Sequence, residues 1–161
     1  MKIGMKIGKA IWDTLEKSLL AKDYSRQNIV NRNFYKQRML GYKLKVCNIK
    51  QCNFTNAILD GSSLVKTYLS ESQCVCTIFD NGNLNRLEAR DVDFTRASFA
   101  NTDITRATFV NCDFTGVDFQ TAIVDNFTSF ENCTGIENDT KKNLETRGAT
   151  FSGKYKNWWV V

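Results

Sequence analysis

Residues 92–124 read VDFTR ASFAN TDITR ATFVN CDFTG VDFQT AIV when they are divided into groups of five. The third residue of every group is apolar, and the same frame runs back without a break to Ile29. All 20 positions of this frame from 29 to 124 are apolar, in a chain that is 42% apolar overall. A period of five matches neither the 3.6-residue period of a helix nor the two-residue period of a strand. The sequence therefore predicts a short structural unit that is repeated along most of the chain.

A second column of residues lies two places before each of these apolar positions. Fifteen of its sixteen members between Cys47 and Ala122 are small, and the exception is Leu87. Leu87 is followed two residues later by Ala89, the smallest member of the large column. This exchange of volumes keeps an interior filled, which predicts that both columns point into one core.

The repeat resembles the pentapeptide-repeat family, whose consensus is Ala-(Asp/Asn)-(Leu/Phe)-x-x. The resemblance covers residues 45–126 closely and residues 27–44 in degenerate form, because larger residues there occupy the small column. It implies an all-β fold, a right-handed quadrilateral β-helix with four pentapeptides per coil, and it implies no single function, since members of one fold have many roles. The consensus appears most clearly in Val92-Asp93-Phe94, Ala97-Ser98-Phe99, Cys112-Asp113-Phe114 and Val117-Asp118-Phe119, and the misplaced large residues are Arg32, Gln37 and Tyr42.

Four pentapeptides per coil predict that residues 20 apart stack on one another. One such series is mainly aromatic and another is entirely aliphatic, as expected if like side chains stack. At a strand spacing of about 4.8 Å, five coils would form a rod about 24 Å long. The two series are Phe34, Phe54, Cys74, Phe94, Phe114 and Leu44, Leu64, Leu84, Ile104, Val124.

The chain divides into a basic arm (residues 1–26), the β-helix (27–135, degenerate over 27–44) and a C-terminal cap (136–161). Residues 1–46 hold 11 Lys/Arg and 3 Asp/Glu, whereas residues 47–135 hold 6 and 11. In the arm, helical spacing predicts an amphipathic helix over residues 6–22, with Trp12 beside its apolar face. This helix would either cap the first coil or reach a partner or a membrane surface. Its apolar face is formed by Ile7, Ile11, Leu15 and Leu19.

Before the C-terminal cap, near residue 126, the five-residue frame slips by one, which predicts a bulge or a turn out of the coil. A short helix is expected over residues 137–147, with Asp139 or Thr140 as its N-cap and Gly148 as its stop. Residues 149–153 then restore one pentapeptide. The apolar ending with Trp158 and Trp159 would pack on the last coil or contact a partner.

The residues predict no catalysis, no cofactor and no metal site. The chain has no histidine, and it has no phosphate-binding loop, dinucleotide motif or nucleophile elbow. Four of its six cysteines fall on the inward columns, Cys76 should point outward, and Cys133 is left open. With no secretory signal or membrane-spanning run, a cytoplasmic location is expected. The inward cysteines are Cys47, Cys52, Cys74 and Cys112.

One outward column is positively charged, because Lys66, Arg86 and Arg106 lie 20 residues apart. These side chains would either pair with acidic residues on neighbouring corners or bind a partner. The sequence favours a non-catalytic binding or structural module, such as a subunit of a larger assembly, that meets a protein partner or a second copy through a rod end. The candidate contact residues are Trp12, Lys66, Arg86, Arg106, Trp158 and Trp159.

Two alternatives stay open. Some members of the family mimic duplex DNA and act on type II topoisomerases, but that role needs a strongly negative rod. Direct binding of nucleic acid or of a membrane surface through the basic arm is the other, although the arm has few aromatic residues for stacking on bases.

Overall fold

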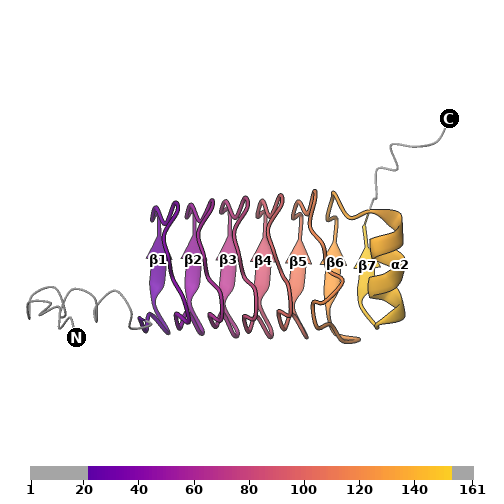
Figure 1. Ribbon diagram of the computed structural model, residues 1–161, viewed down its shortest axis with the longest axis horizontal. Coiled ribbons are helices and arrows are strands. Elements are labelled where there is room, and N and C mark those ends of the chain that lie inside the picture. The colour runs from indigo at the N-terminus through magenta and orange to yellow at the C-terminus, as the bar shows by residue number, and fades with distance from the viewer. Residues whose placement is uncertain (1–21, 154–161) are drawn as a thin grey trace, which may run out of the picture.

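The computed structural model describes residues 22–153, which form a straight rod of stacked coils (Figure 1). Seven strands of three residues each lie side by side in one sheet, in chain order from β1 to β7. Every neighbouring pair is parallel. The strands are β1 (Asn28–Val30), β2 (Asn48–Lys50), β3 (Tyr68–Ser70), β4 (Glu88–Arg90), β5 (Thr108–Val110), β6 (Ser129–Glu131) and β7 (Thr150–Ser152).

The coil has four sides, because three further columns of parallel bridges accompany the sheet. Examples are the pairs Asn33 with Asn53, Arg38 with Ile58 and Lys43 with Ser63, all 20 residues apart. On the sheet, Ile29 pairs with Ile49 at the same offset. The predicted solenoid of four pentapeptides per coil is confirmed.

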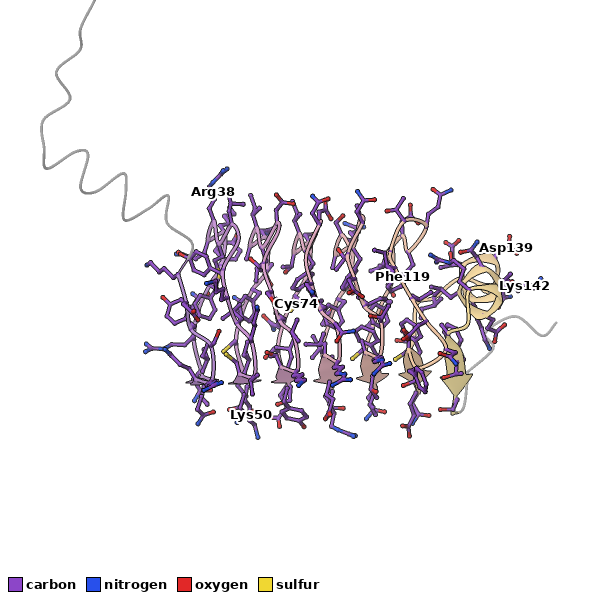
Figure 2. All side chains as sticks on the ribbon, turned by 90° about the horizontal axis from the view of Figure 1, so that it is seen from below. Arg38, Lys50, Cys74, Phe119, Asp139 and Lys142 are labelled. Carbon is purple, nitrogen blue, oxygen red and sulfur yellow. The ribbon has the colours of Figure 1, made fainter. Side chains whose placement is uncertain are left out.

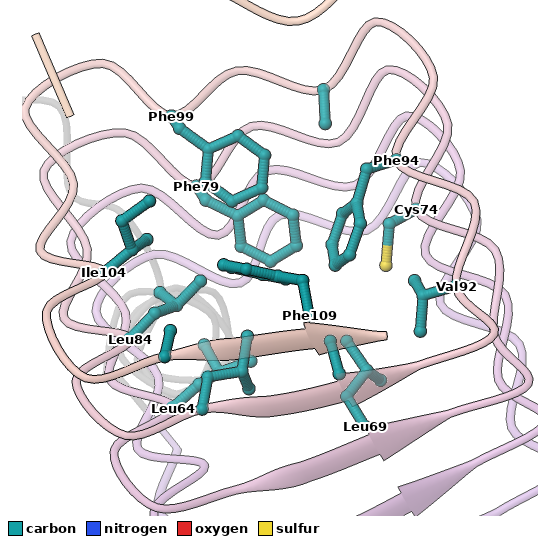
Figure 3. Close-up of a cluster of buried hydrophobic side chains, with 14 of the residues drawn as sticks. Leu64, Leu69, Cys74, Phe79, Leu84, Val92, Phe94, Phe99, Ile104 and Phe109 are labelled. Atoms are coloured by element: carbon teal, nitrogen blue, oxygen red, sulfur yellow. The ribbon is translucent and has the colours of Figure 1, made fainter. Parts of the chain in front are cut away.

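The large column forms a continuous core along the rod axis (Figure 3). Phe79 stacks on Phe99 with ring centroids 5.2 Å apart, and Phe94 lies 5.2 Å from Phe114 with nearly parallel rings. Cys74 points into the same core and is fully buried. Like side chains therefore stack on like, as the 20-residue comparison predicts.

The residues of the small column are limited in size because their side chains pack against the main chain of the preceding coil. Ser62, Thr77 and Thr102 are buried, and each hydroxyl donates a hydrogen bond to a main-chain carbonyl 23 residues earlier. The donor–acceptor distances are 2.7, 2.7 and 2.8 Å. A longer polar side chain would leave its polar atoms buried without a partner, at a cost of about 1–3 kcal/mol.

The first coil begins at Asp23, earlier than the boundary expected after residue 26. Asp23 forms a bridge with Lys43, and the Tyr24 amide donates to the Lys43 carbonyl at 2.8 Å. The misplaced large residues of this coil are explained by its position, since no described coil lies in front of it. Arg32 and Gln37 are exposed and Tyr42 is half-buried.

The predicted frame slip is present between β5 and β6, where Phe109 pairs with Phe130 at an offset of 21 residues. Thr128 takes the place of a small-column residue, because it is fully buried and its hydroxyl donates to the Ile104 carbonyl at 3.1 Å. The extra residue is absorbed in the turn that precedes Thr128.

A short helical cap of nine residues follows, the helix α2 (Asn138–Thr146), which lies across the end of the rod beside β7 (Figure 1). The expected N-cap was wrong: the N-cap is Glu137, which makes no side-chain capping bond, and Asp139 lies in the first turn. The chain enters the helix earlier because Gly135, at φ +77°, turns it against Thr115. Gly148 ends the helix as predicted, with a φ of +104°.

Two expectations fall on residues that lie outside the described part of the chain. They are the amphipathic helix over residues 6–22, apart from Lys22 itself, and the packing of the tail with Trp158 and Trp159.

Candidate interaction surface

The corners of the coil decide which side chains face outward together. At most corners one residue has a positive φ, and this residue projects from the rod while its amide bonds to the next coil. Because the coils repeat every 20 residues, corner residues form straight columns with a spacing of about 4.8 Å. One column is Arg26, Val46, Lys66, Arg86 and Arg106, with φ values of 63°, 58°, 55°, 57° and 58°.

The structure brings the predicted residues Lys66, Arg86 and Arg106 together on this corner, and all three are exposed. It also extends the column, since Arg26 lies at its N-terminal start and exposed Lys45 adjoins Val46. Sequence reasoning placed Arg26 in a separate arm, although its distance of 40 residues from Lys66 was the available signal. We call Arg26, Lys45, Lys66, Arg86 and Arg106 the basic track.

The pairing of the track differs along its length. Arg106 lies 3.9 Å from the Asp125 carboxylate and 5.2 Å from the centre of the Phe127 ring. Within residues 22–153, Lys66 and Arg86 form no ion pair. The expectation that neighbouring corners neutralise the column is therefore met only at Arg106.

The acidic corner next to the track is already occupied. Glu71 accepts a 2.9 Å ion pair from Lys50 and a 3.0 Å hydrogen bond from Gln51. The hydrogen bond with Glu71, followed by its charge, raises the pKa of Lys50. Asp91 accepts a 2.9 Å hydrogen bond from Asn111. These bonds hold the carboxylates within their own column, so they leave Lys66 and Arg86 available.

Many acidic residues of the rod have a structural role in turns. The carboxylates of Asp93, Asp103 and Asp113 each accept a hydrogen bond from the amide two residues later, at 2.8–2.9 Å. Asp118 does the same at 2.8 Å. This is the Asx turn that fits Asp and Asn to the consensus position.

Charge is segregated along the rod axis. Residues 22–50 carry eight Lys/Arg and one Asp/Glu, whereas residues 51–135 carry five and eleven. Figure 2 shows Arg38 extending from the N-terminal end and Lys50 from the sheet face, while Asp139 and Lys142 lie on α2. The basic track runs from this basic end along the otherwise acidic body.

The cysteines are structural. Cys47, Cys52, Cys74 and Cys112 are buried as predicted, Cys76 is half-exposed, and Cys133 is also buried. Burial raises the pKa of Cys74, and a hydrogen bond with Cys133 together with burial raises that of Cys112. A protonated thiol is a poor nucleophile and a poor metal ligand.

The part of the chain from residue 22 to residue 153 contains no group of three or more Cys, Asp or Glu side chains placed to hold a metal ion. None of its helices is long and apolar enough to cross a membrane.

Comparison with known proteins identifies the repeat. Residues 47–86 and 89–124 match the family model described as Pentapeptide repeats, in eight copies. Together with the coil geometry, this match shows that residues 47–86 and 89–124 are pentapeptide repeats of this family. No curated protein sequence matches the chain.

Solved structures of the same fold agree. A pentapeptide repeat protein (Rfr23) from the cyanobacterium Cyanothece 51142 is 18% identical, with a TM-score of 0.54 over 75% of this chain and 92% of that chain. QnrB1, a plasmid-mediated fluoroquinolone resistance protein, is 14% identical, with a TM-score of 0.56 over 82% and 76%. At these identities the likeness shows the fold alone.

Proposed function

We propose that this protein is a non-catalytic binding module that recognises an acidic surface of a protein partner through the basic track. The observation that carries the proposal is the row of cations that runs from the basic end onto the acidic middle of the rod, where Lys66 and Arg86 have no ion pair among the described residues. Like charges about 5 Å apart repel one another, so an anionic partner would relieve that repulsion.

The rigidity of the solenoid supports this role. The track residues are held by main-chain bonds, such as Lys66 N to Asn85 O at 3.0 Å and Arg86 N to Thr105 O at 3.0 Å. Their Cα positions are therefore fixed before a partner arrives, and less entropy is lost on binding. The track begins at the N-terminal end of the rod, which agrees with a contact near that end.

The basic track argues against mimicry of duplex DNA. A DNA mimic must present anions to a surface made for phosphates, and this corner would present cations to it.

The proposal is tested with a fluorescein-labelled polyglutamate peptide and the full chain, by fluorescence anisotropy. We expect binding at about 50 mM salt that weakens strongly at about 300 mM, because exposed charges are screened. The variant K66E/R86E should bind about tenfold or more weakly. Arg106 is left unchanged because it contacts Asp125 and Phe127.

The matched control is R96E/K142E, which changes the net charge equally but lies on another corner and on α2. It should bind almost as well as the wild type. An equal loss of affinity in both variants would mean that binding depends on net charge and not on the basic track, which would overturn the proposal. Binding of a DNA duplex that exceeds polyglutamate binding and depends on Lys66 and Arg86 would replace the protein partner by a nucleic acid.

A further inference from the structure

The N-terminal end of the rod has an open cross-section. A cavity of about 400 Å³ lies there, with an apolar floor and a polar rim. On its floor, Phe34 stacks on Phe54 of the next coil, with centroids 4.7 Å apart, and its other face has no ring against it among the described residues. The floor is formed by Tyr24, Ile29 and Phe34, and the rim by Gln27, Asn28, Arg32, Asn33 and Gln37.

Large apolar side chains surround this opening. Val30, Tyr35 and Leu40 are 37%, 44% and 41% exposed, one on each of three sides of the first coil, and Val46 on the next coil is 52% exposed. These are four of the seven exposed large hydrophobic residues within the described chain. Such a concentration at one end of a rod indicates a surface that is covered by something else.

Among residues 22–153, the main chain of the first coil also has no partners on its outer side. In the second coil, the amides of Asn48, Asn53 and Ile58 donate to the carbonyls of Gln27, Arg32 and Gln37 at 2.9–3.0 Å. The equivalent amides of the first coil, at Asn28, Asn33 and Arg38, have no described coil in front of them. An open edge of this kind invites pairing with another chain unless it is covered.

A second copy of the chain fits this end poorly. Two N-terminal ends brought together would oppose two sets of eight Lys/Arg, each accompanied by one Asp/Glu within residues 22–50. A head-to-tail arrangement meets α2, which covers the other end with its fully buried Leu144.

The chain itself supplies an occupant. Residues 1–21 are joined through Lys22 to the first coil, two residues before Tyr24 of the cavity floor, so their local concentration there is high without any association step. In a helical pattern, an apolar row is formed by Ile7, Ile11, Leu15 and Leu19, and Trp12 lies beside that row. Such a row has the apolar surface that is needed to cover the exposed core at this end of the rod. Asp13 and Glu16 are the acidic residues of the segment, and they suit a rim that carries Arg32.

We infer that residues 7–20 dock on the N-terminal cross-section, with the Trp12 indole in the cavity over Tyr24, Ile29 and Phe34. The segment closes the core at this end as α2 closes it at the other. This inference is independent of the proposed function, because the basic track lies on the outer wall of the coils and stays accessible when the cross-section is covered.

The test uses the full chain with Trp158→Phe and Trp159→Phe, which leaves Trp12 as the single tryptophan of the three. We expect Trp12 emission to be blue-shifted relative to the urea-unfolded chain and its acrylamide quenching to be several-fold lower. Adding I11D/L15D should abolish both effects. In the same variant, amide exchange of residues 27–40 should become about tenfold faster, while that of residues 129–152 stays unchanged.

The matched control A10D/T14D introduces the same two charges off the apolar row and should leave fluorescence and exchange unaltered. Solvent-like Trp12 emission in the parent, or exchange at 27–40 that ignores I11D/L15D, would overturn the inference. Protection that appears only as the mass measured by light scattering doubles above 18.4 kDa would assign the site to a second copy instead.

Discussion

The two ends of the described rod are finished in different ways. At the C-terminal end, β7 extends the sheet, Phe151 stacks on Phe130 at 4.8 Å, and α2 covers the core. The Arg147 guanidinium donates to the carbonyls of Ala122 and Phe119 at 2.7 and 2.9 Å. At the N-terminal end the corresponding core surface is a cavity surrounded by exposed apolar and basic residues.

This difference arises because each end of a solenoid needs its own cover. The interior coils need only their neighbours, whereas each terminal coil needs a cover that the repeat cannot provide. At the C-terminal end, a guanidinium and a helix satisfy groups that a further coil would have bonded. Among the described residues, the N-terminal end has no such cover.

The largest expected effect contrasts the middle of the rod with its open end in one stacked column. Phe114 is fully buried, so F114A should lower the free energy of unfolding by about 3–5 kcal/mol. In the I11D/L15D variant, in which residues 7–20 no longer cover it, half-buried Phe34 has one face toward the open cavity, so adding F34A should cost about 1–2 kcal/mol. Urea unfolding followed by circular dichroism measures both. Equal costs would mean that the N-terminal end is packed as tightly as the centre.

A smaller effect is expected at the closed end. Leu144 is the fully buried residue of α2, so L144A should cost about 2–4 kcal/mol by opening a cavity under the cap. Its neighbour Asn143 is exposed, and N143A should change stability by less than about 0.5 kcal/mol. If L144A matched N143A in thermal unfolding, α2 would not be a cap.

Two glycine substitutions distinguish the stability cost of backbone strain from the cost of a steric clash. Gly135, which leads into the cap, has a φ of +77°, and a Cβ there would lie 2.3 Å from the Thr115 amide nitrogen. Gly61 has a similar φ of +66° but open space around it. We expect G61A to cost about 1 kcal/mol and G135A about 2–3 kcal/mol, because only the latter must also move main chain. Similar melting temperatures for the two variants would contradict this account.

The smallest expected effect is on the loss of folding stability at low pH. Burial acts to raise the pKa of Asp125, but hydrogen bonds from the Arg106 amide, the Thr128 hydroxyl and the Phe127 amide outweigh it and lower the pKa below 3.8. A lowered carboxyl pKa stabilises the fold above the unfolded value, and this contribution is lost as the pH falls through the folded pKa. D125N should therefore flatten the loss of stability between about pH 4 and pH 2. An unchanged pH profile in D125N would show that these bonds do not favour the ionised form.

Much of this fold could be predicted from the sequence because the repeat fixes the side chains of each coil independently of the others. The columns at Phe94 and Ala97, the slip before Phe130 and the outward row of Lys66 and Arg86 all follow from counting in fives. The exchange of volumes between Leu87 and Ala89 is also visible in the sequence, and both residues are buried in the core.

What could not be predicted depends on contacts outside the repeat. The N-cap at Glu137 results from the turn at Gly135 against Thr115, and no local signal in the sequence encodes that approach. The slip also places Cys133 next to Cys112, one coil apart, through the 21-residue offset. The sequence analysis assigned Arg26 to the arm because the first coil departs from the repeat. Its large residues Arg32 and Gln37 are tolerated only at an end of the rod.

The central claim is that an acidic partner binds along the basic track. The most direct measurement is a hydrogen-exchange footprint of polyglutamate on the full chain at low salt. We expect slower exchange in peptides that contain Lys66, Arg86 and Arg106, and no change around Asp93 and Asp113 on the neighbouring side. Protection centred on Asp93 and Asp113, or spread evenly over the rod, would contradict it.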